Sequence, residues 1–182
     1  MKTTSAKSKM NVTRLKSLIR DIPDFPKKGI MFKDITPLLK HPEALQFACH
    51  ELAQKFKGMN IEQVVAVESR GFIFGTAVAC ELGAGFIPVR KPNKLPAATE
   101  SITYSLEYGK DSLEVHCDAI AKGTRVIIVD DLLATGGTAE AVIRLIEKLD
   151  GIVVGVVFLV ELTFLKGRDR LRKYPIHSLI SF

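Results

Sequence analysis

The chain has little of what membrane, secreted and zinc-bound proteins usually show. Its longest uninterrupted apolar run is nine residues, Ile152 to Val160, which is too short to span a bilayer and fits a buried strand. Its three cysteines, Cys49, Cys80 and Cys117, lie far apart without zinc-type spacing, so we expect core thiols in a reducing, cytoplasmic compartment. The polar, basic start predicts no signal peptide, and residues 1–11 are expected to be a disordered tail.

Two common nucleotide-binding motifs are also missing. No Gly-Lys-Ser/Thr triplet ends a Walker A loop, and "GAGFIP" from Gly83 has no third glycine in place and precedes a strand. The net charge of +6 favours anionic partners. The densest basic stretch, Lys166 to Lys173, fits a solvated surface helix or loop better than a nucleic-acid patch, because no aromatic RNA-binding signature accompanies it. We therefore expect neither a nucleic-acid nor a membrane partner.

What is present is a repeated alternation of apolar strands and helical patterns. The 182 residues and the apolar fraction of 47% suffice for one compact domain. Strands are expected at 64–67, 86–89, 126–129 and 152–160, and helices at 13–20, 42–58, 72–82 and 139–149. This order predicts an α/β fold with a central parallel sheet flanked by helices, in which 152–160 is the last central strand.

Two less regular regions interrupt this alternation. Residues 21–42 hold four prolines, so they predict an irregular excursion with a short extended piece at 30–32. Residues 90–109 combine small polar residues with scattered β-formers, and long segments of this kind are often functional lids. The stretch "SLEVHC" that follows alternates like a strand with one open face.

The most informative stretch is "VIIVDDLLATGGT", residues 126–138. Asp130 and Asp131 end an apolar strand, and ligands bind at the carboxyl ends of strands in an open parallel sheet. The backbone N–H groups of Ala134 to Thr138 then lead into a helix N-terminus, which attracts phosphate.

Small residues make this loop suitable for a phosphate. Gly136 and Gly137 let the backbone curl closely around the anion. Thr135 and Thr138 would add hydroxyl donors, or one of them would serve as a helix cap. Two acids that accept bonds from ribose hydroxyls, beside a nest for the 5'-phosphate, predict a reader of a ribose phosphate.

This stretch resembles the phosphoribosyl pyrophosphate (PRPP) signature of the type I phosphoribosyltransferases. The segments "FPKKGIMFKDITPLL", "ESRGFIFG", "RKPNKLP" and "YSLEYGKDSLE" resemble, in the same order, segments of adenine phosphoribosyltransferases. The resemblance runs from about Ile22 to Ser178. It implies the type I phosphoribosyltransferase fold in one domain, residues 12–182, that works as a homodimer. Within it, we expect a small hood at about 12–40, a core at about 41–182 and a flexible lid at about 92–112.

The resemblance also implies an activity. The 5-phosphoribosyl group of PRPP would pass to adenine, giving AMP and pyrophosphate in purine salvage. The alternatives are a phosphoribosyltransferase for another base and a non-catalytic PRPP-binding regulator; the hood and the lid acid Glu107 argue against them. Magnesium is the implied cofactor, arriving with PRPP and held mainly by substrate oxygens and water, with no protein ligand predicted.

Each matching residue then receives an implied role. Asp130 and Asp131 would bind the ribose hydroxyls, and the 5'-phosphate would lie on Ala134, Thr135, Gly136, Gly137 and Thr138. Pyrophosphate would be gripped by the loop of Glu68, Ser69, Arg70 and Gly71, in which the peptide before the serine is often cis. Arg70 would be the cation, because its planar fork bonds phosphate oxygens bidentately; a surface ion pair is the alternative.

Three further cations follow in "RKPNKLP". Arg90, Lys91 and Lys94 would serve the pyrophosphate of their own or a neighbouring subunit. A solvated basic loop is the alternative for all three.

The base and the proton are assigned to the hood and the lid. Backbone groups of Met31 and Lys33 would read adenine's edge, while Phe32 and Leu132 would sandwich the ring; core packing is the alternative for Phe32. The reaction passes through an oxocarbenium-like sugar while the attacking nitrogen sheds a proton. Glu107 would handle that proton, and Tyr108 would order the closed lid, which excludes water. Glu107 and Arg70 are thus the predicted catalytic residues.

Overall fold

The computed structural model describes residues 9–106 and 109–182 of the chain. The chain divides into two compact units between Ala48 and Cys49, and helix α3 (Pro42–Gln54) contributes to both. Most of the predicted tail lies outside the described residues. Asn11, the last residue of the predicted tail, is ordered as a helix cap: its side-chain oxygen accepts a hydrogen bond of 2.9 Å from the backbone N–H of Arg14 at the start of α1 (Val12–Ser17).

The first unit is built on a two-stranded antiparallel ribbon. Strand β1 (Arg20–Ile22) pairs with β2 (Phe32–Asp34), so the extended piece predicted at 30–32 occurs two residues later. Helix α2 (Thr36–Leu39) follows, with a proline in its first turn, where the missing N–H of proline is not needed. The prolines therefore shape this excursion without removing all of its secondary structure.

The second unit is built on a five-stranded parallel sheet with the order β4-β3-β7-β8-β9. Its strands are β3 (Gln63–Val67), β4 (Gly85–Val89), β7 (Arg125–Leu133), β8 (Ile152–Glu161) and β9 (Ile176–Ser181). The inner strands are apolar on both faces because helices cover both faces of a parallel sheet. The predicted α/β architecture with a central parallel sheet is confirmed.

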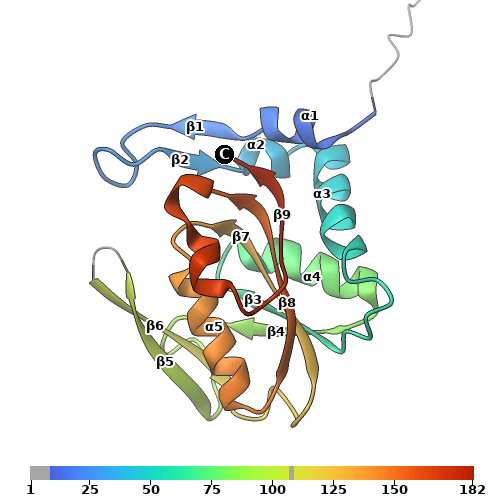
Figure 1. Cartoon of the computed structure of the whole chain (residues 1–182), viewed down its shortest axis with the longest axis vertical. Helices are drawn as coiled ribbons and strands as arrows, with labels where there is room; N and C mark the ends of the chain where they lie inside the picture. Colours follow the sequence, from blue (N-terminus) through green and yellow to red (C-terminus); the bar gives the residue numbers. More distant parts are fainter. Residues whose placement is uncertain (1–8, 107–108) are drawn as a thin grey trace, which may run out of the picture. The chain divides into compact units, whose positions relative to one another are not determined.

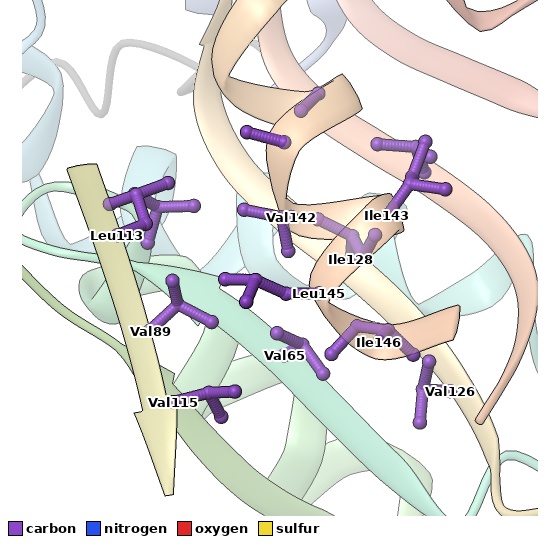
Figure 2. Close-up of a cluster of buried hydrophobic side chains, with 14 of the residues drawn as sticks. Val65, Val89, Leu113, Val115, Val126, Ile128, Val142, Ile143, Leu145 and Ile146 are labelled. Atoms are coloured by element: carbon purple, nitrogen blue, oxygen red, sulfur yellow. The ribbon is translucent and has the colours of Figure 1, made fainter. Parts of the chain in front are cut away.

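Helices α4 (Gly71–Leu82) and α5 (Gly137–Lys148) cover opposite faces of this sheet (Figure 1). Gly75 lets α4 approach closely, since a Cβ there would lie 2.5 Å from the Cβ of Ala66. The neighbouring residue Val65 points to the other face and packs with α5 (Figure 2). The core on that face includes Val65, Val89, Leu113, Val115, Val126, Ile128, Val142, Leu145 and Ile146.

The predicted lid is more regular than its sequence suggests. Residues 99–106 form strand β5 (Thr99–Leu106), which pairs antiparallel with β6 (Gly109–His116). The sequence predicts no strand between residues 90 and 109, so β5 is an element that sequence reasoning missed. Ile102 and Tyr104 point one way from β5 and pack against the core, an alternation that the polar residues between them obscure.

The end of the chain brings a second correction. The sequence predicts 152–160 as the last central strand, but β9 extends the sheet beside β8. Only Ile180 of β9 is fully buried, so its stretch "IHSLIS" lacks the continuous apolar run of the inner strands. Between β8 and β9 lie two 3-10 helices, η1 (Thr163–Leu165) and η2 (Gly167–Leu171). Most of the basic stretch is thus a largely exposed 3-10 segment, as the surface interpretation predicts.

Candidate active site

The two acids lie at the carboxyl end of β7, where the sequence predicts them. Asp131 has a side chain only 8% exposed, and its Oδ2 lies 2.9 Å from Nη2 of Arg70, which follows β3. Asp130 accepts a hydrogen bond of 2.9 Å from the backbone N–H of Asp131. Its Oδ1 also packs against Gly71, where a Cβ would lie 2.9 Å away. The ends of β3 and β7 thus meet at the carboxylates of Asp130 and Asp131, which together are called the acidic floor.

The surroundings of this floor change the proton affinity of both carboxyls. Burial, followed by the charge of Asp131, raises the pKa of Asp130 well above its usual value. Burial also raises the pKa of Asp131, and the Arg70 guanidinium offsets part of that rise. Hydrogen bonds donated to the ionised forms would lower both pKa values. Two adjacent hydroxyls of a ribose are donors of this kind.

The loop from Ala134 to Thr138 curls because Gly136 adopts φ +83°, a conformation that side chains disfavour. Gly136 is the N-cap of α5, which begins at Gly137, so the alternative of a threonine cap at Thr135 or Thr138 does not hold. The first N–H groups of a helix have no intrahelical partner and carry partial positive charge. This geometry fits the phosphate nest that the sequence predicts, and the binding of phosphate there stays a prediction.

Arg90, which follows β4, holds the loop after β3. It donates to the two carboxylate oxygens of Glu68 at 3.0 and 3.1 Å and to the carbonyl of Lys94 at 2.9 Å. Glu68 also accepts from the backbone N–H of Lys91 at 3.2 Å. The hydrogen bond from Arg90 is the main cause that lowers the pKa of Glu68. The Glu68–Ser69 peptide is cis, as the family resemblance implies.

A side-chain network connects the hairpin of β5 and β6 to the phosphate loop. Asp111 on β6 accepts from Lys91 and, at 3.2 Å, from the hydroxyl of Tyr104 on β5. That hydroxyl lies 3.3 Å from Oγ1 of Thr138. Burial raises the pKa of Asp111, but the hydrogen bond from Lys91 and that from the Ser112 backbone outweigh it and leave the pKa lowered. The Asp111 carboxylate thus connects Lys91, a predicted pyrophosphate-binding cation, through Tyr104 to Thr138 of the phosphate nest.

The residues predicted to read the base lie in the first unit. Phe32 packs edge-on against Phe25, with ring centroids 5.1 Å apart. Lys33 pairs with Asp21 on the neighbouring strand at 2.6 Å, so its side chain is engaged within the ribbon. Met31, directly before β2, is 46% exposed.

Comparisons with known proteins settle the family. A model of the phosphoribosyl transferase domain matches residues 34–179. The adenine phosphoribosyltransferase of Thermoanaerobacter sp. (strain X514) is 57% identical over 173 residues, which cover 95% of this chain and 100% of that protein. This chain belongs to the adenine phosphoribosyltransferase family.

Solved adenine phosphoribosyltransferases have the same fold. The crystal structure of the enzyme from Thermoanaerobacter pseudethanolicus is similar with a TM-score of 0.92 and 56% identity, over 94% of this chain and 100% of that one. The Saccharomyces cerevisiae enzyme, solved in complex with an imino-altritol bisphosphate and adenine, gives a TM-score of 0.87 and 41% identity, over 92% and 97%. The predicted type I phosphoribosyltransferase fold is confirmed.

Most of the predicted substrate-binding residues of this chain gather at one edge of the sheet. Strands β4, β3 and β7 are parallel neighbours, so the segments that follow them leave the same edge. The segments after β4 and β3 carry Arg90, Lys91 and Lys94, and Glu68, Ser69, Arg70 and Gly71. The carboxyl end of β7 carries Asp130, Asp131 and Leu132, and the chain after it carries Ala134, Thr135, Gly136, Gly137 and Thr138. Glu107 and Tyr108 lie outside the described residues, so their roles stay predictions.

Sequence reasoning missed several residues around the loop. Tyr104 and Asp111 contact Thr138 and Lys91, and Gly167 lies against the loop backbone. The spacing of Tyr104 and Asp111 across a hairpin is a signal that would have paired them, had β5 been recognised. Gly167 has no such signal, because its partner is 31 positions earlier in the chain.

Membrane and metal features can be assessed for residues 9–106 and 109–182. Within these ranges no helix combines the length and apolar character needed to cross a membrane, and no three His, Cys, Asp or Glu side chains gather into a metal site. The carboxylates of Asp130 and Asp131 are hard oxygen donors of the kind that suits magnesium together with water. Cys49, Cys80 and Cys117 are free thiols, but Cys49 is only partly buried and Cys80 and Cys117 are exposed, so the expectation of core thiols is wrong.

Proposed function

We propose that this chain catalyses the reaction of its family, in which adenine displaces pyrophosphate from PRPP to give AMP. One observation carries the proposal: Asp130 and Asp131 lie near the carboxyl end of β7, just before the phosphate nest, and Asp131 is paired with Arg70, which follows the neighbouring strand β3. This arrangement supports assigning the ribose hydroxyls and the 5'-phosphate to the end of β7 and pyrophosphate to the end of the neighbouring strand β3.

Each part of PRPP meets a different kind of group. The ribose hydroxyls donate to Asp130 and Asp131, and these bonds stabilise the ionised carboxylates. The 5'-phosphate lies on the N–H groups from Ala134 to Thr138. Arg70 carries five donors, so it can keep its bond to Asp131 while it holds pyrophosphate. Its charge is then already oriented when negative charge develops on the leaving group.

The chemical step needs a proton acceptor and dry surroundings. As the bond from the sugar to pyrophosphate breaks, positive charge builds on the ring, and a nitrogen of adenine attacks the same carbon. We assign to Glu107 the proton that this nitrogen loses. The hairpin that carries Glu107 would exclude water, which would otherwise hydrolyse PRPP.

Magnesium fits this site as a companion of PRPP. When bound, it would neutralise part of the pyrophosphate charge, held mainly by substrate oxygens and water. Asp130 and Asp131 are the protein groups suited to accept hydrogen bonds from that water. Asp131 is held in place for this by Arg70.

Recognition of the base is assigned to the first unit. The backbone groups of Met31 and Lys33 would read the edge of adenine, with Phe32 as an aromatic surface for the ring. The pairing of Lys33 with Asp21 supports a backbone role, because it holds the lysine side chain within the ribbon. Leu132, the last predicted contact of the base, follows the acid pair on β7.

Two features of the family remain proposals for this chain. We expect a homodimer, in which Arg90, Lys91 and Lys94 serve the pyrophosphate site of their own or the partner subunit. We also expect a cytoplasmic location, because three free thiols suit a reducing compartment.

The test is release of pyrophosphate from PRPP and magnesium, with adenine present and absent. We expect release that depends on adenine and forms AMP in equal amount. Release without AMP would indicate hydrolysis, and no release with any base would contradict the proposed function.

A further inference from the structure

The phosphate loop is in backbone contact with a segment far along the chain, just after β8. A Cβ at Gly167 would lie 2.2 Å from the carbonyl oxygen of Ala134 and 3.1 Å from the backbone nitrogen of Gly136. A Cβ at Gly136 would in turn lie 2.5 Å from the carbonyl oxygen of Gly167. Two glycines on separate segments thus approach each other as closely as backbone allows.

The two glycines are needed for different reasons. Gly136 has φ +83°, whereas the backbone of Gly167 is outside the left-handed region. A side chain at position 167 would therefore meet no conformational strain of its own. It would strike Ala134, whose carbonyl is part of the loop, so that the loop or the segment would have to move.

The segment is fixed by an ion pair and by the core. Arg168 donates through Nε and Nη2 to the two oxygens of Glu161, both at 2.7 Å, and Glu161 is only 4% exposed. The same guanidinium donates to the carbonyl of Ile176 and the hydroxyl of Ser178, both at 3.2 Å. Leu171, at the end of η2, is completely buried. The residue next to Gly167 is thus anchored to both β8 and β9.

We propose that Gly167, Arg168 and Glu161 are positioning residues for the 5'-phosphate, acting as the outer wall that sets the curvature of the Ala134–Thr138 loop. The inference rests on the proposed function, which places the phosphate on that loop. The wall touches the loop from the side of Ala134 and Gly136. The pyrophosphate loop has an anchor of its own, the pair of Glu68 with Arg90. Substitutions in the wall should therefore weaken binding of the 5'-phosphate end of PRPP and leave binding of pyrophosphate unchanged.

The test compares two ligands that report the two ends separately, ribose 5-phosphate and magnesium pyrophosphate, by calorimetry on the full chain. Gly167→Ala should weaken ribose 5-phosphate roughly 10- to 100-fold, the worth of one hydrogen bond to a charged group. Arg168→Gln should weaken it about 2- to 10-fold, and Arg168→Lys should recover part of the loss. Pyrophosphate affinity should stay within about twofold, since no phosphate hydrogen bond is lost there.

Arg172→Gln is the matched control, because it removes an arginine from the same segment whose pair with Asp169 is exposed. It should change neither affinity. A folded Gly167→Ala variant that binds ribose 5-phosphate like wild type would overturn the inference, as would equal weakening of both ligands. If Gly167→Ala does not fold, the same two outcomes are judged on Arg168→Gln. Wild-type protein that binds neither ligand would instead contradict the proposed function itself.

Discussion

The two phosphate-binding regions of the site are held in different ways. The loop after β7 is shaped by backbone contacts, with Gly136 and Gly167 fitted against each other. The segments after β3 and β4 are held by side-chain ion pairs, Arg90 with Glu68 and Lys91 with Asp111. Backbone packing fixes a single loop geometry. An arginine or lysine in an ion pair, by contrast, can exchange its carboxylate partner for a phosphate group. The difference suits a substrate whose 5'-phosphate stays bound while its pyrophosphate leaves.

Glu107 has no assigned role in either phosphate-binding region, so its substitution should affect chemistry alone. Glu107→Gln removes the proposed proton acceptor and keeps the size of the side chain. We expect turnover to fall about 10²- to 10⁴-fold, the usual worth of a positioned base, while both ligand affinities stay close to wild type. Steady-state kinetics with PRPP and adenine would measure this. Near-normal turnover at saturating substrate would remove Glu107 from the mechanism.

In the loop after β7, the shape of the backbone should determine the affinity for ribose 5-phosphate. Gly136→Ala introduces a Cβ 2.5 Å from the Gly167 carbonyl, so the N–H groups turn away from the phosphate. We expect ribose 5-phosphate to bind about 10²-fold more weakly, as for the loss of one to two charge-assisted hydrogen bonds. Calorimetric titration of the variant gives this affinity directly.

Gly83→Ala is the control for that substitution. Gly83 also has a left-handed backbone, φ +68°, but a Cβ there would meet nothing within 4 Å. Both variants should lose about 1 kcal/mol of stability through backbone strain, and only Gly136→Ala should lose affinity. Equal affinities in the two would show that the close contact does not matter.

In the segments after β3 and β4, charge should determine the affinity for pyrophosphate. Arg90→Gln removes the two hydrogen bonds that the guanidinium donates to Glu68. The Glu68 carboxylate in the pyrophosphate loop then lacks this partner and repels pyrophosphate. Pyrophosphate affinity should fall about tenfold, and ribose 5-phosphate affinity should not change. Lys122→Gln, which removes a cation from an exposed pair with Asp150, is the control for net charge. A loss of similar size in that control would mean that overall charge, not Arg90, sets the affinity.

The ionised acidic floor, which both regions share, should lower the stability of the ligand-free protein. Burial raises the pKa of Asp130, so its ionised form destabilises the fold. That penalty is absent below the unfolded pKa of about 3.9 and is complete once pH exceeds the folded pKa. Asp130→Asn should therefore raise the ligand-free melting temperature by roughly 2 °C or more near neutral pH. PRPP binding should weaken at the same time.

Thermal melts at several pH values check the sign of this effect. The gain from Asp130→Asn should shrink as pH falls and vanish below about 3.9, where the wild-type carboxyl becomes protonated in both the folded and the unfolded state. A gain that is independent of pH, or a lower melting temperature at neutral pH, would contradict burial of the ionised carboxylate as the cause.

The sequence predicts the parts of this molecule that depend on local patterns. Strands β3, β7 and β8 follow from continuous apolar runs, and the nest follows from paired acids and glycines within one stretch. Strand β9 and hairpin strand β5 escape this reasoning because their alternation is weak and their burial depends on the sheet beside them. Gly167 and the pair of Arg168 with Glu161 depend on contacts between distant segments, which periodicity does not encode.

Competition between adenine and hypoxanthine for PRPP tests the central claim most directly. Backbone groups at Met31 and Lys33 that fit adenine would set donor against donor with hypoxanthine, and unpaired buried polar groups support strong discrimination. With both bases at equal concentration, we expect AMP as the product, for wild type and for Lys33→Arg alike. Comparable incorporation of hypoxanthine by wild type would contradict the adenine assignment, and a changed preference in Lys33→Arg would contradict recognition by the backbone.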